Sequence, residues 1–189
     1  MGNEGESTSL RHDPALADDI ETAACAVAHG QAAAPALDRT LVAAFASPVA
    51  EFLLHFASDT GYRVVLFEPD MARAGASWAT RYPVTGEFGD YLDETADVVV
   101  TDHHRPELGV VLRDALASKA RWVGILGNPR HQGPHIQALA DLGVPDEDIA
   151  RVHRPVGLNI GSRTPPEIAI ATLAGLIADR NGRPGGFTF

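Results

Sequence analysis

Several residues of this sequence are placed where a small ligand could bind, because each follows a short apolar run that predicts a buried β-strand. They are Ser47 and Val49 after residues 40–45, Glu68 after 62–67, Asp102 after 98–100, and Gly127 and Asn128 after 121–126. Helical patterns between these runs indicate parallel strands, whose carboxyl ends lie at one edge of a sheet. Ligands of such sheets bind at that edge. We therefore predict that these residues bind a cofactor.

Glu68 is the residue that favours a nucleotide as the ligand. It follows Ser47 at about the 20-residue spacing at which an acid binds the ribose hydroxyls of a dinucleotide; the alternative is a solvated carboxylate at a strand end. The first turn, Phe45-Ala46-Ser47-Pro48, argues against a dinucleotide, because it contains no glycine that would let the backbone approach a pyrophosphate. Either a nucleotide binds differently here or its binding has been lost.

Other combinations of reactive residues are weaker, and we predict neither a catalytic residue nor a metal site. His103 and His104 are adjacent, and adjacent residues of a strand point to opposite faces. Gly133-Pro134 interrupts the helical spacing of His131 and His135. No Gly-Lys-Ser/Thr occurs, which argues against a P-loop enzyme.

Length and composition limit the kinds of protein this chain can be. It has 189 residues, a net charge of −10 and 45% hydrophobic residues, which is typical of one globular domain, or of one domain with an appendage. The acidity argues against a nucleic acid partner, and no apolar stretch is long enough to cross a membrane. The only cysteine, Cys25, lies among alanines, so we expect a small buried residue. We expect a cytoplasmic protein, since no signal peptide is recognisable and no internal disulfide can form.

The order of the predicted elements indicates an α/β fold. We expect a disordered acidic tail over residues 1–12, an Ala-rich helical appendage over 13–38 that could pair two copies of the chain, an α/β domain over 39–183, and a short tail over 184–189. Strands are predicted at 40–45, 62–67, 98–100, 121–126 and 156–160, and helices at 48–60, 106–118, 134–142, 145–152 and 165–180. Residues 69–96 are interpreted as a solvated acidic loop with one short helix. The fold class is therefore Rossmann-like, with a mostly parallel sheet flanked by helices.

The segment from Arg151 to Ala171 resembles the signature of the XdhC/CoxI family. Its sequence contains Pro-Val-Gly-Leu-Asn-Ile-Gly-Ser-Arg-Thr-Pro-Pro-Glu-Ile-Ala, where members usually show P-[IV]-G-L-D-I-G-x-x-T-P-x-E-I-A. The matching positions that we expect to matter are Gly157, Asn159, Gly161, Thr164 and Glu167. Weaker likeness upstream extends the resemblance over about residues 40–181. Two departures stand out: Phe45-Ala46-Ser47-Pro48 replaces the family's Gly-Ala-Gly-His, and Asn159 replaces its aspartate.

The resemblance implies an accessory protein. Members of the family assist molybdenum hydroxylases such as xanthine dehydrogenase and carbon monoxide dehydrogenase, through a Rossmann-like domain and a separate N-terminal domain whose cysteine is linked to handling of the molybdenum cofactor. This chain is similar to the Rossmann-like domain alone, and Cys25 does not match the N-terminal motif. The expected partner is thus a molybdenum hydroxylase or its maturation machinery, with NAD(P) or the molybdenum cofactor as candidate ligands. The alternatives are an NAD(P)-dependent oxidoreductase and a non-catalytic dimerisation module.

Overall fold

The computed structural model describes residues 22–128 and 130–186 and divides the chain into two units, Met1–Ala36 and Leu37–Phe189. The predicted acidic tail, residues 13–21 of the predicted appendage and the last three residues lie outside the described part. In the first unit a helix covers residues 22–28, so the described helix ends well before residue 38, the end of the predicted helical appendage. Gly30 follows it with a φ of 68°, the left-handed conformation typical after a helix end. Cys25 is exposed, so the expectation that it is buried was wrong.

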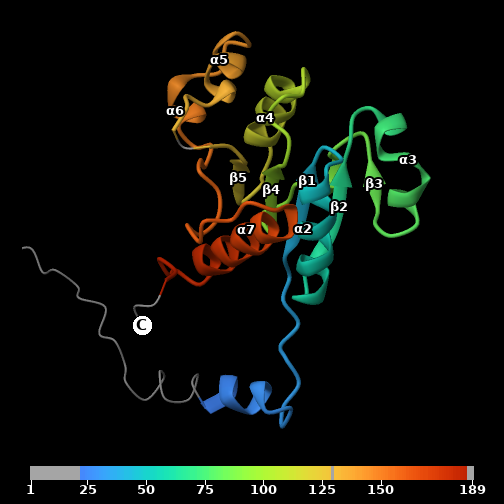
Figure 1. Cartoon of the computed structure of the whole chain (residues 1–189), viewed down its shortest axis with the longest axis vertical. Helices are drawn as coiled ribbons and strands as arrows, with labels where there is room; N and C mark the ends of the chain where they lie inside the picture. Colours follow the sequence, from blue (N-terminus) through green and yellow to red (C-terminus); the bar gives the residue numbers. More distant parts are fainter. Residues whose placement is uncertain (1–21, 129, 187–189) are drawn as a thin grey trace, which may run out of the picture. The chain divides into compact units, whose positions relative to one another are not determined.

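In the described part of the second unit, five parallel strands form one sheet with the order β3-β2-β1-β4-β5 (Figure 1). This order and the helical crossovers confirm the predicted Rossmann-like fold. In chain order the elements are β1 (Thr40–Ala44), α2 (Pro48–Asp59), β2 (Arg63–Phe67), α3 (Met71–Ala79), β3 (Val84–Thr85), the 3-10 helix η1 (Gly89–Tyr91), β4 (Ala96–Val100), α4 (Leu108–Ala117), β5 (Trp122–Ile125), α5 (Pro134–Ala140), α6 (Asp146–Ile149) and α7 (Pro165–Arg180).

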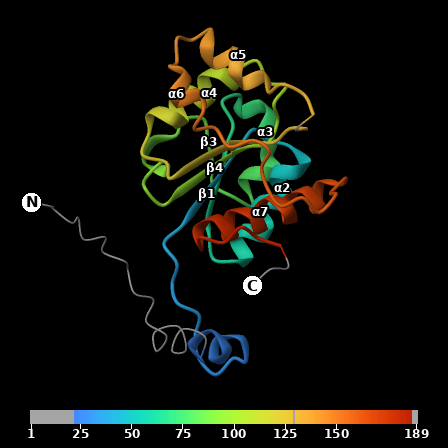
Figure 2. The same cartoon turned by 90° about the vertical axis from the view of Figure 1, so that its left-hand side faces the viewer.

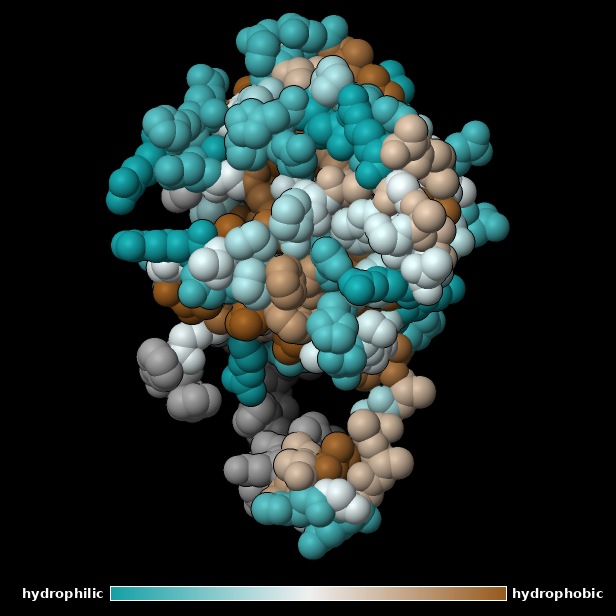
Figure 3. All heavy atoms as spheres, turned by 45° about the vertical axis from the view of Figure 1, so that its right-hand side comes forward, coloured by the Kyte–Doolittle hydropathy of each residue, from teal (hydrophilic) through white to brown (hydrophobic). Residues whose placement is uncertain are grey.

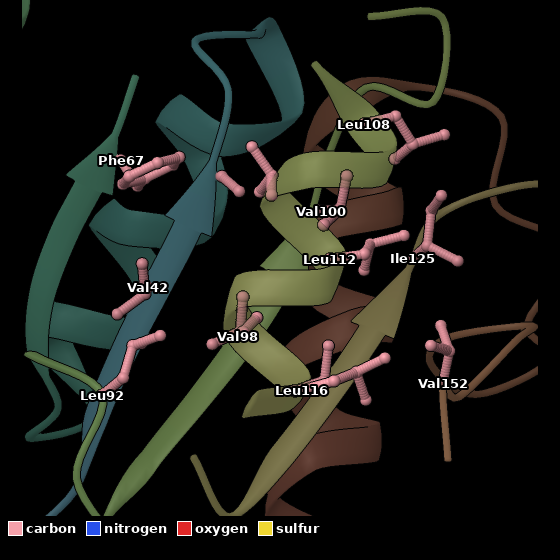
Figure 4. Packing of buried hydrophobic residues seen from close by; sticks show 14 of the residues in the cluster. Val42, Phe67, Leu92, Val98, Val100, Leu108, Leu112, Leu116, Ile125 and Val152 are labelled. Carbon is pink, nitrogen blue, oxygen red and sulfur yellow. The ribbon is translucent and has the colours of Figure 1, made fainter. Parts of the chain in front are cut away.

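Helices cover both faces of the sheet (Figure 2). Two hydrophobic cores lie between the helices and the sheet. Alternate strand residues point to opposite faces. On one face Val42, Val98 and Ile125 pack with Leu112 of α4 and Val152 (Figure 4). On the other face lie Leu41, Leu66 and Val99, together with α2, α7 and Ala74 of α3. A sheet buried on both sides explains why its strands are continuously apolar in the sequence.

Two stretches of the chain differ from the prediction. Residues 156–160 form a loop and no strand, because Gly157 has a φ of 90° and the Leu158 N–H donates to the Ala171 carbonyl of α7 at 3.0 Å instead of to a strand. The fifth strand is β3, in the segment interpreted as an acidic loop, which also holds α3 and η1. A two-residue strand has no periodicity by which a sequence could reveal it.

Helix α7 is anchored at both ends. At its start Thr164 and Glu167 form the predicted capping box. Near its end Arg180 donates from Nε to Oδ2 of Asp97 in β4 at 2.7 Å, and Arg121 donates to Oδ1 of the same carboxylate at 2.8 Å. Asp97 is fully buried, so the two guanidinium groups supply the partners that its charge requires. This network fixes α7 to the amino-terminal edge of the sheet.

On the face seen in Figure 3, hydrophilic side chains (teal) cover much of the surface and hydrophobic ones (brown) reach it in small groups. No helix in the described part of the chain is long and apolar enough to cross a membrane.

Candidate functional site

The turn after β1 lies at the carboxyl edge of the sheet, where the sequence predicted a ligand. Phe45 begins this turn with a φ of 74°, the left-handed region that glycine favours, and its side chain is fully buried. Two hydrogen bonds hold its backbone: its N–H donates to the Phe67 carbonyl at 2.8 Å, and its carbonyl accepts from Oγ1 of Thr101 at 2.9 Å. A phenylalanine thus occupies the conformation for which a dinucleotide-binding turn uses glycine.

Ser47 and Val49 lie at the start of α2, where a phosphate would approach. Oγ of Ser47 accepts from the Ala50 N–H at 3.0 Å and donates to Oγ1 of Thr101 at 2.9 Å, so it serves as the helix cap. Pro48 has no N–H to offer. Among the described residues, Val49 is therefore the position in the first turn of α2 that has an N–H without a hydrogen bond to a protein acceptor.

Glu68, which follows β2, is fully buried rather than solvated. Its Oε2 accepts from the Ala46 N–H at 2.9 Å and from Nη1 of Arg105 at 3.1 Å. Its Oε1 accepts from the Asp70 N–H at 3.2 Å and from Nη2 of Arg105 at 2.6 Å. These four hydrogen bonds use the acceptor capacity of a carboxylate, which has about four lone-pair sites.

Arg105, in the segment between β4 and α4, reaches Glu68 by crossing the end of β1. The sheet order places β1 between β2 and β4, and the guanidinium lies over the Phe45 ring, 4.5 Å from its centroid. Its Nε is 3.4 Å from a carboxylate oxygen of Glu107, and only 10% of its side chain is exposed. The hydrogen bonds to Glu68 are the main cause that raises the pKa of Arg105 above its ordinary value. Arg105 therefore remains charged and covers the point at which the strand order reverses.

The ends of β4 and β5 form the other half of this edge. Oδ1 of Asp102 accepts from the His104 N–H at 2.9 Å, and burial lowers the pKa of the neighbouring His103. Oδ1 of Asn128 accepts from the Arg130 N–H at 3.0 Å, and the Asn128 carbonyl accepts from Nη2 of Arg154 at 2.6 Å. Gly127 lies beside the same guanidinium, since a Cβ there would be 2.8 Å from Nε of Arg154. Asp102, Gly127 and Asn128 thus shape the loops of this edge.

The residues of the predicted signature have two structural roles: Gly157 packs against α7, and Glu167 caps the start of this helix. A Cβ on Gly157 would lie 2.8 Å from the Ala171 carbonyl carbon and oxygen, and a Cβ on Gly175 would lie 2.8 Å from the Gly157 Cα. The two glycines therefore bring the loop into contact with α7. Oε2 of Glu167 accepts from the backbone N–H groups of Arg163 and Thr164 at 2.7 and 3.1 Å, which lowers its pKa.

The middle of the signature is exposed. Asn159 and Gly161 both lie at the surface, and a Cβ on Gly161 would meet nothing within 4 Å. Ile160 between them is 56% exposed. The signature therefore forms a surface loop between the contact of Gly157 with α7 and the cap formed by Glu167.

Comparison with known protein families shows to which family the chain belongs. The profile of the XdhC Rossmann domain matches residues 41–176, from β1 into the last part of α7. The chain belongs to the XdhC Rossmann-domain family. Its sequence is also 46% identical over 65 residues to YqeB of Escherichia coli (strain K12), a match that covers 34% of this chain and 12% of YqeB.

A solved structure shares the fold of the family domain. A protein described as a xanthine dehydrogenase from Bacillus halodurans superposes with a TM-score of 0.62 over 80% of this chain and 45% of its own, at 23% identity. At this identity the likeness concerns the fold. The chain spans less than half the length of both relatives.

The geometry brings out Arg105 as the site residue that the sequence did not predict, and it shows that Phe45, already noted in the glycine-free turn, supports its guanidinium. The sequence showed the altered turn, in which Phe45 stands where the family's motif begins with glycine, but not the side chain that packs on it. Arg105 gave no signal, because its partner Glu68 is remote in sequence and is reached only through the strand order.

The residues of this edge do not fit an ordinary dinucleotide. The ribose acceptor Glu68 is saturated, the turn carries a phenylalanine, and Pro48 removes a phosphate donor. Within residues 22–128 and 130–186, no group of three or more His, Cys, Asp or Glu is arranged to hold a metal ion.

Proposed function

We propose that this chain is an accessory protein in the maturation of a molybdenum hydroxylase, and that it acts in the cytoplasm by binding a partner protein or the molybdenum cofactor. Membership of the XdhC Rossmann-domain family supports the accessory role. The observation that carries the choice of binding over nucleotide-dependent catalysis is the Glu68–Arg105 pair, because it fills the position where a dinucleotide ribose would bind.

The side chains of the edge also favour binding. His103 and His104 follow β4, and Arg130, His131 and Arg154 lie at the loop after β5. These are hydrogen-bonding and cationic groups, which suit the phosphate of a cofactor or an acidic face of a partner. The only cysteine of the chain, Cys25, belongs to the other unit, so the described edge contributes no thiol to sulfur chemistry.

An NAD(P)-dependent oxidoreductase is the competing function. It would need an open ribose position and a glycine-containing phosphate-binding turn, whereas Arg105 occupies the ribose position and the turn contains Phe45 and Pro48 but no glycine. We therefore rank it below the accessory role.

Co-expression tests the proposal. A xanthine-oxidising molybdenum hydroxylase is produced in a host without its own accessory proteins, with and without this chain, and its activity and molybdenum content are measured. We expect both to rise when the chain is present, and tagged chain to retain the hydroxylase. A molybdenum enzyme of the sulfite-oxidising class serves as the control and should not respond. Equal activity and molybdenum content with and without the chain, and no retained hydroxylase, would refute the accessory role.

A further inference from the structure

We propose that Arg105 is an internal ligand in the ribose position at the carboxyl edge of the sheet, and that this one side chain excludes nucleosides and dinucleotides from that position. The proposal rests on the contacts of the edge and not on the accessory role.

The guanidinium of Arg105 makes the contacts that a ribose would make. Its two terminal nitrogens each donate to a different oxygen of Glu68, at 3.1 and 2.6 Å. The 2′ and 3′ hydroxyls of a ribose present two neighbouring donors of the same kind to a strand-end carboxylate. Because the other acceptor sites of Glu68 are taken by the N–H groups of Ala46 and Asp70, a ribose could bind only by displacing Arg105.

Displacement would be unfavourable because Arg105 is enclosed. Its guanidinium lies between the Glu68 carboxylate and the Phe45 ring, with Glu107 beside Nε. With 10% of the Arg105 side chain and none of the Glu68 side chain exposed, the pair is desolvated, so removing one partner leaves a buried unpaired charge. The Glu68–Arg105 pair is thus a buried part of the fold. It differs in this from a surface ion pair, which solvent and salt would weaken.

The test compares full-length wild type with Arg105→Ala, using adenosine, AMP and NAD in isothermal titration calorimetry. We expect no saturable binding to wild type at millimolar ligand, and adenosine binding to Arg105→Ala at least about tenfold tighter than the wild-type limit. Arg113→Ala is the matched control, because Arg113 is an exposed arginine paired with its neighbour Asp114, and it should behave as wild type.

A double variant shows whether the adenosine binding gained by Arg105→Ala depends on the Glu68 carboxylate. Glu68→Gln combined with Arg105→Ala removes both charges together, which is milder than unpairing one, and should lose the adenosine binding gained by Arg105→Ala alone.

Thermal unfolding keeps the test valid if Arg105→Ala is poorly folded. Adenosine at about 100 times its dissociation constant should raise the melting temperature of Arg105→Ala by about 5–11 °C and leave wild type and the double variant unchanged. Saturable adenosine binding to wild type as tight as to Arg105→Ala would overturn the proposal. The proposal would also be overturned if Arg105→Ala showed neither a calorimetric nor a thermal response to adenosine.

Discussion

Replacing Gly157 by alanine introduces a methyl group into the contact between the signature loop and helix α7. Two costs arise together. A φ of 90° is unfavourable for a residue with a Cβ, by about 1–2 kcal/mol. The new Cβ would also lie 2.8 Å from backbone atoms of Ala171 and Thr172, and such overpacking typically costs about 1–3 kcal/mol. We expect Gly157→Ala to lower the free energy of unfolding by about 2–5 kcal/mol.

Gly161→Ala is the matched control within the same loop. Its φ of 70° gives the same backbone cost, but nothing lies within 4 Å of the added methyl group. We expect a loss of about 1–2 kcal/mol, so the difference between the two variants measures the contact with α7. Gly175→Ala tests the same contact from the helix, where a gain of about 1 kcal/mol in helix propensity opposes about 1–3 kcal/mol of overpacking.

The assay is chemical and thermal unfolding of the purified variants. For a chain of this size, each kcal/mol shifts the melting temperature by about 2–4 °C, which gives about 4–20 °C for Gly157→Ala and about 2–8 °C for Gly161→Ala. If both variants lose the same stability, the signature does not pack on α7 as described. If Gly157→Ala is as stable as wild type, the conformational argument is also refuted.

Three further results are expected from the same unfolding measurements. Asp97→Asn should cost about 3–5 kcal/mol because it leaves Arg121 and Arg180 without their buried carboxylate, whereas Asp114→Asn at the surface should cost less than about 1 kcal/mol; equal losses would contradict the network. Ser47→Ala should cost about 1 kcal/mol through loss of the α2 cap, and an unchanged denaturant midpoint would show that the cap adds nothing. The pKa of Glu167 is lowered from 4.5 by its two backbone donors, so its stabilisation is complete above about pH 4.5 and disappears as the pH falls through the lower folded value. Glu167→Gln should lack this contribution to the pH dependence of stability. If the melting temperatures of wild type and Glu167→Gln fell in parallel from about pH 5 to 3, the contribution of Glu167 would be refuted.

The sequence was sufficient where structure depends on neighbouring residues. The runs 40–45 and 121–126 predicted β1 and β5 to within two residues at each end, because strands buried on both faces are continuously apolar. Thr164 and Glu167 predicted the start of α7, because a capping box involves only one helical turn.

Prediction failed where a pattern was too short or ambiguous. Residues 156–160 alternate like a strand, yet the left-handed conformation of Gly157 and its contact with α7 prevent one. Strand β3 has two residues and leaves no pattern to recognise.

The carboxyl edge shows the same division between local and tertiary information. The sequence determined that Ser47, Glu68, Asp102 and Asn128 follow strands, and parallel strands bring their carboxyl ends to one edge. Only the tertiary structure decided which of these groups have partners. Glu68 and Arg105 meet because β1 lies between β2 and β4, and because Phe45, which follows β1, supports the guanidinium that crosses the end of this strand. Strand order and burial determine such long-range pairing, whereas residue type and spacing report only local geometry.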